Sequence, residues 1–319
     1  MLTWFDERLI QYPKPVAIAW QTSFDQLTAP ARQLLQRLAW LAPDPIPESL
    51  MEVPVPENDE QIDAFEPLAE LESYSLVNRA TDRPSFSVHR LVQEVTRRKE
   101  RDDSVHTALI EAQHWIDASF IGDPQNPDDR PVLNPLLTHV LGVSAYADET
   151  GITEPTARLM NQAGRLLDAK AQYAEAEPLY LRALAIREQI LEPNHPDVAQ
   201  SLNDLAELYR TQSVYAQAEP LHQRALAIRE QVLGPDHPAV AQSLNNLAEL
   251  YRTQSVYAQA KPLYQQSLAV YLVSLGIEHP TSRTVLQNYE GLLQEMGKTE
   301  AEIIEALQSL KQQHMHEAP

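Results

Sequence analysis

The chain has 319 residues, with 25 basic and 45 acidic side chains, and its net charge of −20 disfavours a surface built to neutralise nucleic acid phosphates. It contains no cysteine, which excludes disulfides, thiolate nucleophiles and cysteine-ligated metal centres. The 8 glycines and 24 prolines favour short, proline-punctuated helices over glycine-rich phosphate loops.

Neither a targeting segment nor a membrane span is predicted. Asp6 and Glu7 precede any apolar run, which argues against a secretory signal. The longest uncharged stretch, residues 131–147, is shorter than the roughly 20 apolar residues needed to cross a bilayer. A cysteine-free chain loses nothing in a reducing compartment, so we expect a cytoplasmic protein.

Residues 1–101 have the pattern of a small helical unit with a β-hairpin. Apolar spacing predicts helices over residues 29–41 and 59–71, and another from residue 89 to about residue 101. Short runs at 75–78 and 85–88 predict two strands separated by a turn. Helices followed by a hairpin and a further helix predict a winged-helix unit.

Several strings in this region resemble the winged-helix segment of NB-ARC signalling ATPases, the STAND class. They are Tyr-Pro-Lys-Pro-Val-Ala at 12–17, Trp-Gln-Thr-Ser-Phe at 20–24, Tyr-Ser-Leu at 74–76 and Val-His-Arg-Leu-Val-Gln at 88–93. The resemblance implies that residues 1–15 are the tail of a helical domain and that His89 is the remnant of a nucleotide sensor. Arg90 replaces the aspartate of the family's motif, and the alternative is that His89 caps its own helix.

Residues 102–154 are predicted to be connecting helices, the second of which spans about residues 134–148. Proline and aspartate are dense over residues 123–131, which predicts a loop or hinge. Just before this region, the basic cluster of Arg97, Arg98, Lys99 and Arg101 has acidic neighbours, and we interpret it as a solvated helix end.

A repeat with a period of 42 residues fills the rest of the chain, residues 155–319. Residues 198–218 return as residues 240–260 with a single change, Asp204 to Asn246. The copies are drawn at 155–195, 196–237, 238–279 and 280–312. Within a copy, apolar residues at i, i+3, i+4 and i+7 mark two helices. One pair of helices cannot bury its own apolar stripe, so neighbouring copies must stack.

The repeat core, Leu-Asn-x-Leu-Ala-x-Leu-Tyr-Arg followed by Tyr-Ala-x-Ala-x-Pro-Leu, resembles the tetratricopeptide repeat in its 42-residue form, as in kinesin light chains. The resemblance implies an all-α, right-handed solenoid behind the winged-helix unit. His222 departs from the tyrosine at the matching positions 180 and 264. The last copy is expected to be a capping unit whose inward stripe is Ile303, Ile304, Leu307 and Leu310.

Polar residues recur opposite the packing stripe of the first helix in each copy. The resemblance implies that these helices line an inner groove, where the side chains would bind a peptide: Asn161, Arg165, Asn203, Glu207, Arg210, Asn245, Glu249 and Arg252. Asparagine amides can donate to and accept from a peptide backbone. The alternative is a solvated helix face, with Glu207 and Arg210 as an i, i+3 pair, because duplication alone would also repeat it.

No catalytic, cofactor or metal site is predicted. His195, His237 and His279 each precede a proline at a repeat junction and are expected to cap helices, too far apart to share a metal ion. The nearest approach to a phosphate-binding loop is residues 291–299, where five residues rather than four separate the glycines. Thr299 and Glu302 are instead expected to form a capping box.

The sequence therefore predicts a non-enzymatic adaptor or sensor that binds a protein or peptide, with a preference for cationic partners because the chain is acidic. The alternative is the regulatory half of a split STAND-type NTPase that acts with a separate nucleotide-binding chain. DNA binding through the winged helix is the third hypothesis, and the net charge disfavours it.

Overall fold

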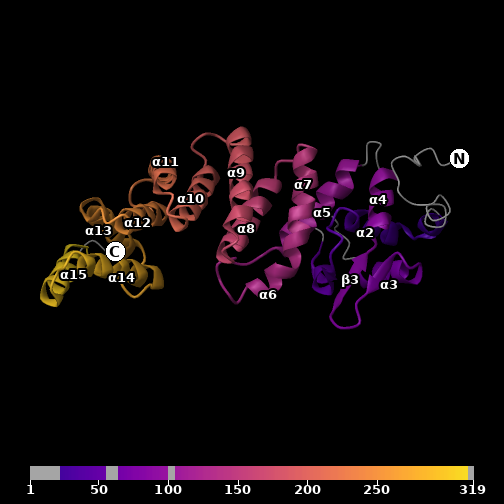
Figure 1. Ribbon diagram of the computed structural model, residues 1–319, viewed down its shortest axis with the longest axis horizontal. Helices are drawn as coiled ribbons and strands as arrows, with labels where there is room; N and C mark the ends of the chain where they lie inside the picture. Colours follow the sequence, from indigo (N-terminus) through magenta and orange to yellow (C-terminus); the bar gives the residue numbers. More distant parts are fainter. Residues whose placement is uncertain (1–21, 55–63, 100–104, 315–319) are drawn as a thin grey trace. The chain divides into compact units, whose positions relative to one another are not determined.

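The computed structural model describes residues 22–54, 64–99 and 105–314, and the expected helical-domain tail at 1–15 lies outside them. The described part is mostly helical, as predicted (Figure 1). The chain divides into two compact units, residues 1–179 and 180–319. The expected start of the repeats at residue 155 falls inside the first unit.

The first unit begins with helices around a small sheet. Helix α2 (Ala29–Leu38) is followed by strand β1 (Ile46–Pro47), the 3₁₀ helix η1 (Glu48–Glu52) and α3 (Phe65–Ser73). Strands β2 (Val77–Arg79) and β3 (Ser85–Val88) form the predicted hairpin, and α4 (Arg90–Lys99) follows. The sheet is antiparallel with the order β1-β3-β2, and β1 was not predicted because two residues carry no periodicity.

Helices α5 (Val105–Ser119), α6 (Arg130–Leu133), η2 (Asn134–Leu136), α7 (Leu137–Glu149) and α8 (Thr156–Ala169) complete most of this unit. Helix α5 packs against α2 and α7, and α7 packs against α8. Arg37 of α2 and Glu111 of α5 form an ion pair at 2.6 Å. Helices expected only to connect two domains therefore belong to the body of the first unit.

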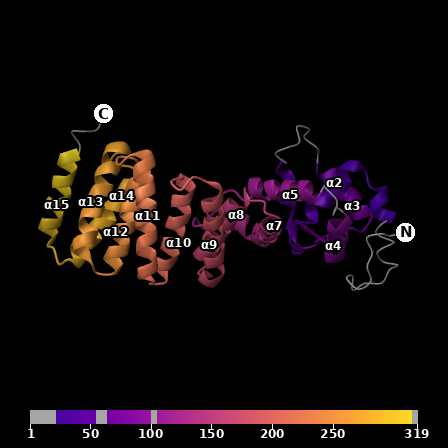
Figure 2. The same cartoon turned by 90° about the horizontal axis from the view of Figure 1, so that it is seen from above.

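The repeat helices are α9 (Tyr173–Ile190), which crosses the division between the units, and then α10 (Pro196–Thr211), α11 (Tyr215–Leu233), α12 (Pro238–Thr253), α13 (Tyr257–Ser274), α14 (Pro280–Glu295) and α15 (Glu300–His314). From α10 to α14 each helix packs against the next, and α15 contacts both α13 and α14. Figure 2 shows α10 to α15 as one stack of helices, with α15 at the outer end. This is the stacking that the repeated apolar stripes predict.

The turn inside each repeat has one left-handed residue. Ser213 has φ 61° and Ser255 has φ 61°, and the amide after each donates back into the preceding helix at 2.8 Å. The last repeat places Gly297 at this position, with φ 74°. Glycine adopts this conformation without the steric cost that a side chain brings, so the last turn does not carry that cost.

The capping helix α15 is amphipathic, but its stripe is narrower than predicted. Ile303 and Leu310 are buried, whereas Ile304 is 47% exposed and Leu307 is half-buried. The prediction that Ile304 points inward is therefore wrong. Helix α15 packs against α13 and α14, and the row of Ile303 and Leu310 is the part of it that they cover.

Candidate functional site: the first-helix face of the repeats

The repeat junctions hold the three periodic histidines as helix caps. His195, His237 and His279 are the N-caps of α10, α12 and α14, and their Nδ1 atoms accept from the amide two residues later at 3.1, 3.1 and 3.2 Å. A proline follows each of them as the first helical residue. The capping prediction is confirmed. Among the described residues no group of three potential metal ligands exists.

The predicted asparagine ladder exists, but it joins helices to one another. The Asn246 amide of α12 donates to Oδ1 of Asn203 on α10 at 2.9 Å, and the Asn288 amide of α14 donates to Oδ1 of Asn245 at 3.2 Å. Asn203 is only 4% exposed, whereas Asn245 is half-buried. These amides therefore fasten successive first helices together, and Asn245 is the one of the two groove candidates that a partner can reach.

The candidates in the first repeat belong to the first unit. Asn161 is 4% exposed. Arg165 donates to Oδ1 of Asp123 at 2.8 Å, so it closes the loop that follows α5. These two side chains thus have structural contacts within their own unit, which the repeat pattern alone did not predict.

The charged candidates form ordered pairs on α10 and α12. In both Arg210 and Arg252, Nε and Nη2 donate to one carboxylate oxygen, that of Glu207 at 3.0 and 2.9 Å and that of Glu249 at 3.3 and 2.9 Å. Arg252 also reaches Glu295 of α14 at 2.9 Å. The side chains of both pairs are between 17% and 27% exposed, so a partner can contact them.

A residue of the second helix in the same repeat contacts each of these two carboxylates. Nε2 of His222 lies 3.3 Å from Oε1 of Glu207, and the hydroxyl of Tyr264 donates to Oε1 of Glu249. Burial alone would raise the pKa of Glu207, but the contacts with His222 and Arg210 hold that pKa below its usual value. Burial likewise would lower the pKa of Arg210, and Glu207 and Glu249 together raise it.

The effect of Glu249 on Arg210 crosses from α12 to α10, so the two pairs belong to one electrostatic row. Glu207, Arg210, Glu249, Arg252 and Glu295 alternate in sign along the first helices of three repeats. The repeated face is thus a row of fixed, alternating charges bordered by half-buried amides.

Two buried arginines that the sequence analysis missed join consecutive repeats. Nη1 of Arg187 donates to Oγ of Ser201 at 2.7 Å, and Nη1 of Arg229 donates to Oγ of Ser243 at 2.8 Å. Each arginine lies on a second helix and reaches the first helix of the following repeat. Their 42-residue spacing was the available signal, but an isolated arginine in a helix usually indicates a solvated surface.

His89 lies at the start of α4, where its Nδ1 accepts from the amide of Leu91 at 3.2 Å. The structure thus shows His89 as the cap of its own helix, which was the alternative prediction.

The expected capping box is also present, because Oε2 of Glu302 accepts from the Thr299 amide at 2.9 Å. Residues 291–299 therefore end α14 and start α15, as predicted. Arg97 departs from the expected solvated helix end, since it is half-buried, and Arg101 lies outside the described residues.

The comparisons with known proteins assign the repeats. Residues 155–223 and 210–272 match the tetratricopeptide repeat model, and residues 22–104 match a domain of unknown function, DUF7779. The chain therefore carries tetratricopeptide repeats, whose fold supports a role in protein interaction. None of the described helices has the length and hydropathy of a membrane span.

A curated relative from Hyaloscypha variabilis, described as a nucleotide-binding leucine-rich repeat (NLR)-like protein, is 30% identical over 146 residues. The match covers 45% of this chain and 14% of the relative, so the chain spans a small part of that protein's length.

Two solved structures match parts of the chain, both with a TM-score below 0.5. One is a Podospora anserina protein described as kinesin-light-chain-like with nearly identical TPR-like repeats, at 23% identity and a TM-score of 0.49, covering 59% of this chain and 90% of that one. The other is a STAND protein with a tetratricopeptide repeat sensor from Pyrococcus horikoshii, at 13% identity and a TM-score of 0.31, covering 89% of this chain and 59% of that one.

Proposed function

We propose that the chain is a non-enzymatic adaptor or sensor that captures a protein segment on the first-helix face of its repeats. The observation that carries the proposal is the row of ordered, partly exposed charges on α10, α12 and α14. Side chains that are already fixed lose little conformational entropy when a partner binds, so a preformed row favours affinity.

Arg210, Asn245 and Arg252 are the contacts we propose for this face. Arginine can donate several hydrogen bonds in a fixed plane, and the half-buried amide of Asn245 suits a peptide backbone. Glu207 and Glu249 hold their arginines in place, so their part is to position the donors. The acidic chain as a whole still favours a cationic partner, through long-range attraction that raises the rate of association.

The test begins with the full chain as affinity bait and identification of what it retains. Binding of the purified partner is then compared for Arg210→Ala and for Arg224→Ala, its matched control. Both arginines belong to the second repeat and both pair with a glutamate, but Arg224 lies on α11 and contacts Glu188 at 2.5 Å.

We expect Arg210→Ala to weaken binding at least tenfold, as the loss of a charge-assisted hydrogen bond at an interface does. The control should stay within about twofold, and circular dichroism checks that both variants fold. Equal affinity of the two variants would refute the first-helix face as the binding surface.

We propose as the second candidate the regulatory half of a split NTPase, because the curated relative is described as nucleotide-binding. In that case a separate chain would supply the phosphate-binding loop. Reading the coding sequence next to this chain tests it directly: a neighbouring frame with such a loop, whose product binds this chain, supports the split enzyme. A product that does not bind this chain contradicts it.

Within this proposal the protein acts in the cytoplasm, which suits a cysteine-free chain. The assignment of residues 1–101 to a winged-helix unit also belongs to the proposal. The order of helices, hairpin and helix supports it, and DUF7779 matches residues 22–104.

A further inference from the structure

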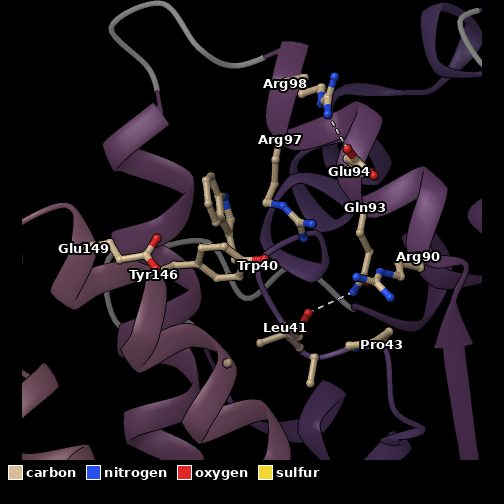
Figure 3. A pocket seen from close by; sticks show the side chains of 12 residues that line it. Trp40, Leu41, Pro43, Arg90, Gln93, Glu94, Arg97, Arg98, Tyr146 and Glu149 are labelled. Atoms are coloured by element: carbon tan, nitrogen blue, oxygen red, sulfur yellow. Dashed lines mark hydrogen bonds and ion pairs between the residues drawn. The ribbon is translucent and has the colours of Figure 1, made fainter. Parts of the chain in front are cut away.

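A cavity of about 700 Å³ lies within the first unit (Figure 3). Its walls are the loop after α2, one face of α4 and the C-terminal half of α7. This volume falls in the range of roughly 300 to 1,000 Å³ that small-molecule sites occupy. No contact described above assigns it a role.

The walls of the cavity are fixed by close packing. The buried amide of Gln93 donates to the carbonyl oxygens of Leu38 and Leu41 at 3.1 and 3.0 Å, which ties the loop to α4. On the other side, a Cβ at Gly142 would lie 3.4 Å from the backbone nitrogen of Ala42, so α7 abuts the same loop. The cavity is therefore preformed.

The charge of the lining is opposite to that of the chain. Arg90, Arg97 and Arg98 come from one face of α4, at i, i+7 and i+8, and the lining has two carboxylates, Glu94 and Glu149. Glu94 forms an ion pair with Arg98. A net positive lining in a chain of net charge −20 concentrates anions at this place.

Arg97 is the central cation of the cavity. Its guanidinium carbon lies 5.9 Å from the ring centroid of Trp40 and 5.1 Å from that of Tyr146. Figure 3 shows this side chain extending from α4 beside the two rings. It donates to the carbonyl oxygen of Ala39 and forms no ion pair with a carboxylate among the residues that the structure places.

Burial lowers the pKa of Arg97, which means that its charge is poorly solvated where it stands. The ring faces, one carbonyl oxygen and the nearby carboxylate of Glu94 compensate for only part of the water that the guanidinium loses. An anion that entered the cavity would supply the missing countercharge.

We propose that this cavity binds a small organic anion with a planar apolar body, an aryl carboxylate or an aryl phosphate. The anionic group lies between Arg97 and Arg90, where a planar guanidinium can donate two hydrogen bonds to it. The apolar body lies against Trp40, Tyr146 and the loop of Leu41 and Pro43. This site is independent of the repeat face and of the function proposed for it.

Calorimetric titration of the full chain at low ionic strength tests the site with four probes: phenyl phosphate, benzoate, phenol and inorganic phosphate. We expect one of the two aryl anions to bind with a stoichiometry of one, and the better of them identifies the anionic group. Phenol and inorganic phosphate should each bind about tenfold more weakly, because each lacks half of the recognised features. Absence of saturable binding by both aryl anions would overturn the proposal.

Three exposed side chains provide variants that should fold. Arg90→Gln should weaken binding about tenfold, whereas Glu149→Gln should strengthen it severalfold because it removes a competing carboxylate. Arg83→Gln is the matched control, since it makes the same charge change on the turn between β2 and β3 outside the cavity. Equal losses from Arg90→Gln and Arg83→Gln would show mere long-range attraction and overturn the site.

Arg97→Lys distinguishes the contribution of the planar guanidinium, its bidentate hydrogen bonds and ring contacts, from that of the positive charge. Lysine keeps the positive charge but cannot form a bidentate contact or stack in the same way, so we expect about a tenfold loss of affinity. Circular dichroism checks that this variant folds. If it misfolds, the opposite effects of Arg90→Gln and Glu149→Gln still decide the matter.

Discussion

The second and third repeats have nearly the same first helix and differ in the helix behind it. Residues 198–218 and 240–260 differ at one position, yet Glu207 is held by a histidine and Glu249 by a tyrosine. Arg229 on the second helix of the second repeat donates to Ser243 of the third repeat. The residue at the matching position of the third repeat is Tyr271. Identical residues on the first helices thus contact different residues on the second helices.

The comparison teaches that repetition in the sequence does not assign a role to a residue. Asn203 and Asn245 are copies of each other, but Asn203 is buried at 4% exposure and Asn245 is half-buried. Helix α12 contacts a first helix on each of its two sides, α10 and α14. Different side chains therefore meet the two copies, since Asn246 donates to Asn203 and Asn288 donates to Asn245. Substitutions that exchange or remove the residues that differ test how much these contacts contribute to the stability of each repeat.

Arg229→Ala should have the largest effect on stability. It removes the contact with Ser243, leaves a cavity at a side chain that is 5% exposed, and strips Gln200 of its donor. We expect a loss of about 3 kcal/mol in the free energy of unfolding. Urea denaturation measures it, with Arg224→Ala on the same helix as control. A loss equal to that of the control would show that the buried arginine does not join the repeats.

Asn246→Ala should have the next largest effect. Asn246 is the one residue of the repeated segment that differs from its copy, and it supplies the hydrogen bond to the buried Oδ1 of Asn203. Leaving that oxygen without a donor should cost about 1 to 2 kcal/mol in the free energy of unfolding.

The control for this variant is Asn203→Ala in the Asn246→Ala background. If the hydrogen bond accounts for the loss, the second substitution should cost much less than it does alone. Fully additive losses would contradict a direct link between α10 and α12.

His222→Tyr should make the second repeat resemble the third. A tyrosine hydroxyl at this position would donate to Glu207 as Tyr264 donates to Glu249, and we expect a gain of about 1 kcal/mol. Thermal denaturation of His222→Tyr and of the reciprocal Tyr264→His checks the sign. Stabilisation by the reciprocal change would contradict the role given to the second helix.

The smallest predicted effect is on how the melting temperature falls at acid pH. Because the folded-state pKa of Glu207 lies below its usual value of 4.5, its contribution is complete above that pH and is lost as the pH falls through the folded-state pKa. Between pH 5 and about pH 2, the melting temperature of the Glu207→Gln variant should therefore fall by less than that of the parent. Glu230→Gln, exposed on α11, is the control and should follow the parent.

The caps and the pairing of helices could be predicted from the sequence because they depend on local chemistry. A histidine before a proline at each junction gives its cap whatever surrounds it, and the 42-residue period places the helices. The capping box of Thr299 and Glu302 is likewise local. Such features need only neighbours within one turn.

The roles of Arg229, Asn203 and Arg97 could not be predicted, since they depend on residues far away in the chain. An arginine or asparagine on the polar side of a helix has the same pattern whether water or another helix covers it. For Arg97, the rings of Trp40 and Tyr146 come from elements 57 and 49 positions away in the sequence. Ile304 shows the converse, since an apolar residue expected to point inward is 47% exposed.

The most direct test of the account is photo-cross-linking of the full chain with its identified partner. A photoreactive amino acid replaces Arg210 on α10 in one sample and Arg224 on α11 in the other. The partner is present at a concentration that saturates even the weakened Arg210 variant. The account predicts cross-links to the partner from position 210 and few or none from position 224. Strong cross-links from position 224 alone would place the partner on the second helices and contradict it.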